Sequence, residues 1–332
     1  MNLFKTSLAT LLLAAFAFSV KAAELKVVTT FLPVYSWTAA VASGEAQVEN
    51  LMEGTVGPHE FQLAPSHVRK LNGADLIVCI GLELEPWLET MIEKGSLKKS
   101  VQVLNMGESL DKKLLISSGE AEAKASEDAH EEGEIHDHDS HAEDNEKGEQ
   151  AGHEHAHEHG EYDPHFWLDP VLAQECVKLI SAQLEQMAPE KAPAFRKNAE
   201  EYNKKLTQLD ELLKESLKEV QQKPFYTQHD AFSYFNKRYG LKCVGVLQQV
   251  PDSDVSPRHL SALFKKIREE GVVAIFLPSK SADRLAERLA QDGKIKVGRL
   301  ETLETLDEGT LNADTYERMM KGNLKALLES LK

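Results

Sequence analysis

The chain of 332 residues carries 54 acidic and 38 basic side chains, a net charge of −16, and a hydrophobic content of 42%. The charge is local, because residues 119–162 hold 16 acids and 2 bases whereas the other 288 residues hold 38 acids and 36 bases. A nearly neutral body with one acidic segment disfavours nucleic-acid binding, which needs a basic surface, and the length and hydrophobic content predict one large or two medium domains.

The first 23 residues have the pattern of a secretory signal peptide. Lys5 precedes an apolar stretch from Leu8 to Val20, and the small residues that follow suit cleavage after Ala22 or Ala23. An N-terminal membrane anchor is disfavoured because the stretch is shorter than the roughly 20 residues of a transmembrane helix. No cysteine lies near the cleavage site to carry a lipid, so we expect a soluble, exported protein that does not itself span a membrane.

Strand-like runs alternate with helix-like segments in both halves of the chain. This alternation predicts βαβ units and an α/β fold of two lobes, each with a mostly parallel sheet flanked by helices. In the first half we expect strands at 25–30, 48–52, 76–80 and 101–104 and helices at 33–41, 65–72 and 86–93. In the second half we expect strands at 225–228, 244–247, 272–277 and 295–300 and helices at 231–239, 257–270, 281–291 and 313–331.

One long amphipathic helix is expected between the halves. Residues 192–220 carry an apolar side chain at every third or fourth position, and about 29 helical residues would extend about 43 Å. A coiled coil with a second chain is the alternative, but the flanking α/β sequence favours a rigid connector. The expected organisation is therefore a first lobe at 24–188, a linking helix at 189–222 and a second lobe at 223–332.

The acidic segment 119–162 interrupts the first lobe. It has few apolar side chains, so it cannot bury enough surface to offset the entropy of ordering, and we expect a disordered insertion. Interleaved imidazoles and carboxylates offer many weak metal ligands, and we hypothesise that the insertion gathers or senses metal ions. The alternative is a solvated charged loop without that role. The segment contains eight of the 13 histidines: His130, His136, His138, His141, His153, His155, His157 and His159.

The three cysteines, Cys79, Cys176 and Cys243, are widely spaced and form no C-x-x-C motif. Neither a cysteine zinc site nor a disulfide framework is encoded. Buried free thiols are the favoured interpretation, and one disulfide among the three stays open.

Three of the remaining histidines lie just beyond expected strand ends or beside the insertion: His59, His165 and His229. Ligands of open α/β sheets bind beyond the carboxyl ends of the strands, so histidines distant in sequence can converge there. Each histidine alone is more readily explained as a turn or capping residue, but three in matching positions indicate a metal site. His67 and His259 fall inside helical patterns and are expected to be surface or packing residues.

These residues also carry a family resemblance. GPHEFQLAPS at 57–66, then the histidine-rich insertion, DPHFWLDP at 163–170 and HDAFSYF at 229–235 resemble the periplasmic zinc-binding proteins of bacterial ABC importers, with similarity from about Leu25 to the C-terminus. The resemblance implies two α/β lobes bridged by a long helix, with zinc held between them by His59, His165 and His229. It further implies a monomer in the periplasm that delivers zinc to a membrane permease driven by a cytoplasmic ATPase.

The fourth metal ligand stays open in the sequence. Members of the family often have an acid after the last strand of the second lobe, where this chain has Glu301, while Pro278 and Ser279 stand where many relatives carry a glutamate. Glu301, Glu60 or a water would complete a tetrahedron. Asp163, Asp169 or Asp230 could accept a hydrogen bond from the second ring nitrogen of a ligand, with helix capping as the alternative.

Three imidazole ligands suit zinc, with copper, nickel or cobalt as competitors, whereas manganese sites favour more carboxylate. A binding protein of the same transport class for manganese or another divalent metal is the alternative. Two other functions compete with transport. A zinc hydrolase would use three histidines and a water, with Glu60 as its general base, yet no G-x-S-x-G or H-E-x-x-H motif occurs. A metal buffer without a transporter would bind mainly through the insertion. We therefore expect a transport protein and not an enzyme.

Overall fold

The structure, a computed structural model, describes residues 24–52, 56–118, 160–247, 257–278, 284–306 and 309–332. The expected signal peptide at 1–23 and most of the histidine-rich insertion lie outside these residues. None of the described helices is both long and apolar enough to cross a bilayer. The three cysteines, all described, are free thiols, so no disulfide joins them.

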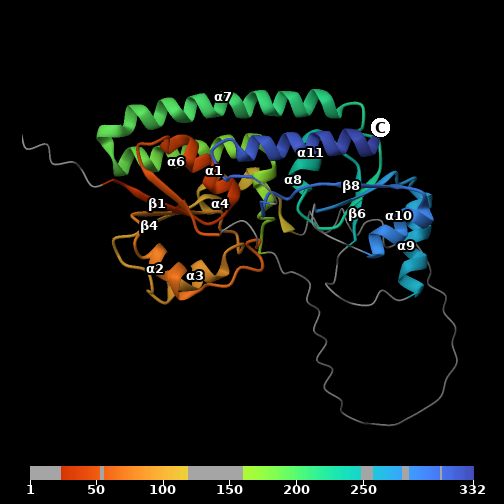
Figure 1. Cartoon of the computed structure of the whole chain (residues 1–332), viewed down its shortest axis with the longest axis horizontal. Helices are drawn as coiled ribbons and strands as arrows, with labels where there is room; N and C mark the ends of the chain where they lie inside the picture. Colours follow the sequence, from red (N-terminus) through yellow and green to blue (C-terminus); the bar gives the residue numbers. More distant parts are fainter. Residues whose placement is uncertain (1–23, 53–55, 119–159, 248–256, 279–283, 307–308) are drawn as a thin grey trace, which may run out of the picture.

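Two parallel sheets of four strands form the core of the two lobes, which confirms the predicted fold class (Figure 1). Their strand orders, β2-β1-β3-β4 and β6-β5-β7-β8, follow the same pattern. The inner strands β3 and β7 are buried throughout, as expected when helices cover both faces of a parallel sheet. The strands are β1 Lys26–Thr29, β2 Gln47–Asn50, β3 Leu76–Cys79, β4 Gln102–Asn105, β5 Phe225–Thr227, β6 Cys243–Val246, β7 Ala274–Leu277 and β8 Lys296–Arg299.

The first sheet is covered on both faces because alternate strand residues point to opposite sides. Val27 and Val78 pack with α1 and α6, whereas Val28 and Ile77 pack with α2 and α3. Proline stands in the first turn of these four helices, where its missing N–H costs no hydrogen bond. The helices of this lobe are α1 Leu32–Ala42, α2 Pro65–Leu71, α3 Pro86–Glu93, the single turn α4 Met106–Ser109 and α6 Pro170–Met187.

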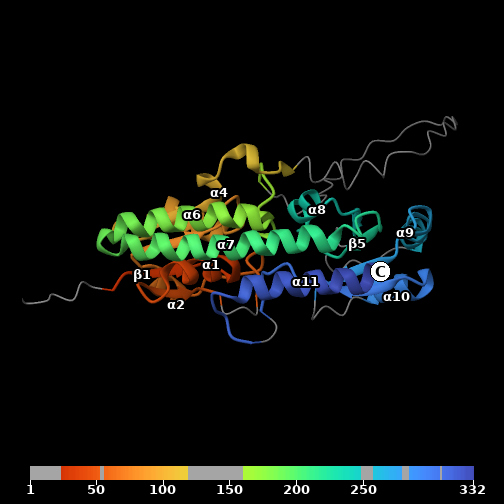
Figure 2. The ribbon, with the colours of Figure 1, turned by 90° about the horizontal axis from the view of Figure 1, so that it is seen from above.

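The predicted linking helix is α7, Ala192–Leu217, of 26 residues. Its apolar stripe is buried from Phe195 to Leu217, against α1, α6 and α11. The helix ends three residues before the predicted Val220, which lies in the following turn and is still fully buried. At 1.5 Å per residue the helix is about 39 Å long and extends along both lobes (Figures 1 and 2).

Helix α11, Thr315–Leu331, forms a second connection that the sequence did not indicate. It covers the second sheet, and its first turn reaches the first lobe, where Tyr316 Oη donates to the Trp167 carbonyl over 2.7 Å and its ring lies 5.4 Å from that of Trp37. Figure 2 shows α11 running beside α7. One continuous hydrophobic core therefore extends through both lobes.

The other face of the second sheet packs against α9, Pro257–Glu269, and α10, Arg284–Gly293. Helix α8, Ser233–Tyr239, follows β5 and lies against the first lobe through the short 3-10 turn η2, His165–Leu168. The carboxyl ends of strands in both sheets face the boundary between the lobes, because the loops that follow β2, β5 and β8 meet there.

Candidate metal centre

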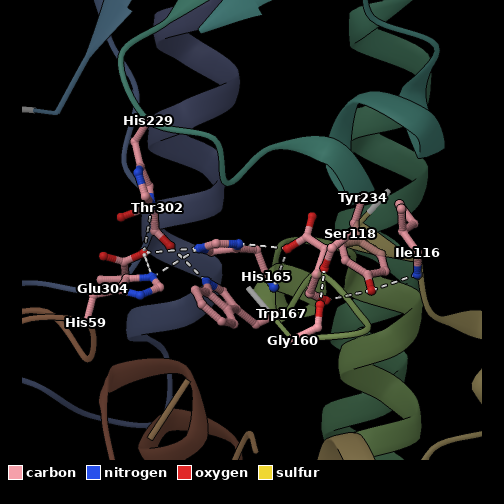
Figure 3. Close-up of polar contacts among 11 residues, drawn as sticks. His59, Ile116, Ser118, Gly160, His165, Trp167, His229, Tyr234, Thr302 and Glu304 are labelled. Carbon is pink, nitrogen blue, oxygen red and sulfur yellow. Dashed lines mark hydrogen bonds and ion pairs between the residues drawn. The ribbon is translucent and has the colours of Figure 1, made fainter. Parts of the chain in front are cut away.

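Four side chains from different parts of the chain meet at the boundary between the lobes. His59 lies in the loop after β2, His165 opens η2, His229 follows β5 and Glu304 follows β8. One potential ligand atom of each residue lies within 4.8 Å of those of the others (Figure 3). Each lobe contributes two of the four side chains.

The distances fit a small metal ion. His59 Nε2 and His165 Nε2 are 3.3 Å apart, and Glu304 Oε1 lies 3.8, 3.7 and 3.8 Å from the Nε2 atoms of His59, His165 and His229. Ligand atoms in a tetrahedral shell with metal–nitrogen distances of about 2.05 Å are separated by about 3.3 Å. Four of the six distances among these atoms are therefore within about 0.5 Å of those in a zinc-sized tetrahedron, and all six are within 4.8 Å.

The site is mostly enclosed, with its open side at two histidines. The His165 side chain is fully buried and that of Glu304 is 13% exposed, whereas those of His59 and His229 are 22% and 30% exposed. An ion would thus enter past His59 and His229 and meet His165 and Glu304 at the inner end.

The orientation of His165 is determined by Asp163. Asp163 Oδ1 lies 2.7 Å from His165 Nδ1 and also accepts the backbone N–H of His165 over 2.9 Å. A carboxylate on Nδ1 holds the proton there and leaves the Nε2 lone pair directed at the other ligands. Asp169, by contrast, caps α6 through the N–H of Val171 over 2.8 Å, which is the alternative the sequence left open for it.

The carboxylate that groups with the three histidines is that of Glu304, whereas the sequence left the fourth ligand open among Glu301, Glu60 and a water. The backbone of Glu301 is held by the Asn323 side chain through two hydrogen bonds of 2.8 Å, and Leu303, buried and at a φ of 63°, turns the chain back towards the histidines. Glu60, beside His59, lies on the exposed surface. The fourth member of the group is therefore Glu304, which only the turn at Leu303 brings inward.

The pKa of the Glu304 carboxyl is raised to about 8, first by burial and then by the negative charge of Glu60, against the lowering effect of a hydrogen bond from Thr302. Its Oε1 atom is buried without a hydrogen-bond donor in the described part of the chain. Gly57 permits this placement, because a Cβ there would lie 3.0 Å from Glu304 Oε2. A buried carboxylate oxygen facing three imidazoles is the arrangement expected of a metal ligand.

The two other histidines do not join this group. His67 lies in α2, where its Nδ1 accepts the N–H of Ala64 over 3.0 Å and its ring packs 4.9 Å from Phe61, consistent with the expected packing role. His259 lies in α9, and its side chain is outside the described part of the structure.

Comparison with known proteins also indicates a zinc-binding protein. Residues 27–330 match the model of the family described as "Zinc-uptake complex component A periplasmic". The chain is 34% identical to the high-affinity zinc uptake system protein ZnuA of Bacillus subtilis over 312 residues, covering 94% of this chain and 89% of that protein.

A second relative is longer than this chain. The zinc-binding lipoprotein AdcA of Streptococcus pneumoniae is 34% identical over 308 residues, which are 92% of this chain and 56% of AdcA, so the chain spans about half the length of that protein. The crystal structure of the zinc-bound ZnuA-like domain of AdcA superposes with a TM-score of 0.70 at 30% identity, covering 93% of this chain and 99% of that domain.

Proposed function

Because this chain belongs to the family of periplasmic zinc-uptake components, we propose that it captures zinc outside the cytoplasm and delivers it to an ABC importer. The observation that carries the proposal is the convergence of three imidazoles and one buried carboxylate between two lobes, with their ligand atoms within 4.8 Å of one another. The names of the Bacillus and Streptococcus relatives support zinc as the cargo.

We assign His59, His165, His229 and Glu304 as the zinc ligands. Three nitrogens and one oxygen suit zinc better than manganese, which favours carboxylate and water. Glu304 also argues against a zinc hydrolase, because a catalytic zinc site keeps one position open for water, whereas here four protein side chains close the shell. Substrate binding for transport therefore explains the site better than catalysis.

The rest of the transport system follows from this assignment. The chain is exported by its first 23 residues, acts as a monomer in the periplasm and docks on a membrane permease that a cytoplasmic ATPase drives. Because each lobe supplies two ligands, a small displacement of one lobe by the permease would separate the ligand pairs and release the ion. The histidine-rich insertion at 119–162 collects zinc for this site.

The test is to count tight sites and identify their ligands. Zinc content and zinc-edge absorption spectra should show one tight ion with nitrogen and oxygen ligands in the wild type and in a variant lacking residues 120–158. His59→Ala should lose that ion in both backgrounds. A metal buffer would instead lose its tight binding with the insertion, and turnover of an ester or of carbon dioxide by the zinc form would favour the hydrolase.

The pH dependence gives an independent check. Imidazole ligands must be deprotonated, so zinc affinity should fall as the pH drops through about 6.5, the ordinary pKa of histidine. Calorimetric titration between pH 7.5 and 5.5 measures this. Unchanged affinity over that range would exclude three histidine ligands.

A further inference from the structure

Two short segments form a neck where the histidine-rich insertion joins the first lobe. The neck comprises residues 116–118 and 160–163, which are paired by an antiparallel bridge between Ser117 and Tyr162. The N–H of Ser118 donates to the Glu161 carbonyl over 3.1 Å, and the N–H of Asp163 donates to the Ile116 carbonyl over 2.9 Å. The insertion therefore leaves and re-enters the body at one point.

A tyrosine of the second lobe bonds both segments of the neck. Tyr234 lies in α8 and is buried, and its hydroxyl accepts the N–H of Ile116 over 2.9 Å while donating to the Asp163 carbonyl over 2.8 Å. Figure 3 shows the phenol ring directed at this point. The same hydroxyl thus links Ile116 and Asp163, which are 47 residues apart in the chain, by its O–H and by one lone pair of its oxygen.

Asp163 connects the neck to the metal centre. Its backbone is bonded to Ile116 and Tyr234, while its carboxylate accepts both the backbone N–H and the ring Nδ1–H of His165. Displacement of the Asp163 backbone would therefore move the group that determines the direction of His165 Nε2. Tyr234 also lies five residues after His229. One short stretch of the second lobe therefore carries His229 and, through Tyr234, supports His165 of the first lobe.

We propose that Tyr234 is a positioning residue for the zinc site, acting through the neck and Asp163 on His165. The inference rests on the proposed zinc-binding function. Removing the hydroxyl would leave a buried N–H and a buried carbonyl without their partner and release the Asp163 turn. Support of this kind around a metal ligand typically contributes a factor of about 10 to 100 in metal affinity.

The experiment compares Tyr234→Phe, Asp163→Asn and the double variant in the full-length chain. Zinc affinity is measured by competition with a chelator, so that the titration reports the tight site. We expect Tyr234→Phe to weaken binding about tenfold and Asp163→Asn about 10- to 100-fold. If Tyr234 acts through Asp163, the double variant should bind no more weakly than Asp163→Asn alone.

Tyr202→Phe is the matched control, because Tyr202 in α7 and Tyr234 are each 3% exposed. The Tyr202 hydroxyl donates to the Ala313 carbonyl over 3.3 Å, away from the neck. The Tyr202→Phe change should leave zinc affinity unchanged. Urea unfolding of each metal-free variant separates lost stability from lost positioning. The d–d spectrum of bound cobalt(II) should change with Tyr234→Phe and not with Tyr202→Phe. A purely structural role of Tyr234 would not produce this selective change in the metal spectrum.

Wild-type affinity in Tyr234→Phe would overturn the inference while leaving the proposed function intact, and so would equal losses in both tyrosine variants that follow their loss of stability. Multiplicative losses in the double variant would show that Tyr234 does not act through Asp163. A wild-type protein without a tight zinc site would overturn the proposed function and this inference together.

Discussion

At the scale of single residues, the metal centre depends on side chains whose charge is controlled by burial. Glu304 faces three imidazoles and is held in a pocket that favours its protonated form when no cation is present. With Glu304 as a zinc ligand, as proposed, the divalent ion would reverse this preference by stabilising the carboxylate. Capture of zinc would then be coupled to release of a proton from Glu304.

This coupling predicts the behaviour of Glu304→Gln. With a pKa of about 8 in the metal-free protein, Glu304 carries about 0.9 of a proton at pH 7, which zinc must displace. Wild-type affinity should rise with pH up to about 8, whereas the variant should keep only the histidine-dependent rise below about pH 6.5 and should bind zinc at least about tenfold more weakly, or about 1.4 kcal/mol. Calorimetry in buffers of different ionisation enthalpy counts the protons.

Glu60→Gln provides the matched control for that measurement. Glu60 is exposed and affects Glu304 only through its charge, so its removal should preserve tight binding. Equal proton release from Glu304→Gln and the wild type would remove Glu304 from the ligand set.

At the scale of elements, buried contacts hold the helices and strands that carry the ligands. Along α7, residues on the buried stripe and residues on the exposed face differ sharply in environment: Leu209 is 1% exposed and Leu212 is 43% exposed. Leu209→Ala should lower the free energy of unfolding by about 2–5 kcal/mol, whereas Leu212→Ala should change it by less than about 0.5 kcal/mol. Urea unfolding measures both, and similar losses would show that α7 does not bury the predicted face.

Glu85 connects the ends of two strands of the first sheet. Its carboxylate accepts Thr30 Oγ1–H over 2.7 Å and the N–H groups of Ile80 and Gly81 over 3.1 and 2.8 Å. Burial nevertheless raises its pKa to about 7 from 4.5, because these hydrogen bonds only partly replace water. This carboxyl therefore binds its proton more tightly in the folded than in the unfolded chain.

The sign of the resulting pH effect follows from linkage. Between pH 4.5 and 7 the folded chain retains a proton that the unfolded chain releases, so the Glu85 contribution to stability is present at low pH and is lost as the pH rises towards 7. Relative to Glu85→Gln, the wild type should lose up to about 3 kcal/mol of unfolding free energy over this interval. Unfolding curves of both proteins at several pH values test this prediction. A difference in unfolding free energy that stays constant with pH would contradict it.

At the scale of the whole molecule, the two lobes share one hydrophobic core and two helices rather than a flexible hinge. α7 spans both lobes, and the start of α11 packs on the first lobe through Tyr316. Such a frame favours small adjustments of the ligand loops over wide opening of the lobes. In the proposed function, zinc would join surfaces that are already close together.

Zinc should consequently stabilise the whole fold. A ligand at 100 times its dissociation constant adds about 2.7 kcal/mol to the free energy of unfolding. Thermal unfolding with and without zinc should show this shift in the wild type, and the His59→Ala, His229→Ala double variant should lose it. A full shift in the double variant would place the stabilising ion in the histidine-rich insertion instead.

The sequence by itself determined the order of the elements, the two-lobe α/β fold and three candidate histidines, two beyond strand ends and one between the insertion and a helix. Hydrophobic periodicity and the position of a residue relative to the expected elements are local properties of the chain. The sequence indicated an acid after the last strand but not which one, since the choice between Glu301 and Glu304 depends on the backbone turn at Leu303 and on Asn323.

Only the tertiary structure decided the contacts between segments distant in sequence. The burial of Glu304, the bond from Asp163 to His165, the position of Tyr234 on the neck and the packing of α11 on both lobes all depend on how helices and loops are placed in three dimensions. No local pattern encodes these distances. The three histidines of the candidate metal centre could be proposed from local signals, whereas its carboxylate, Glu304, and the residues that position the histidines required the folded chain.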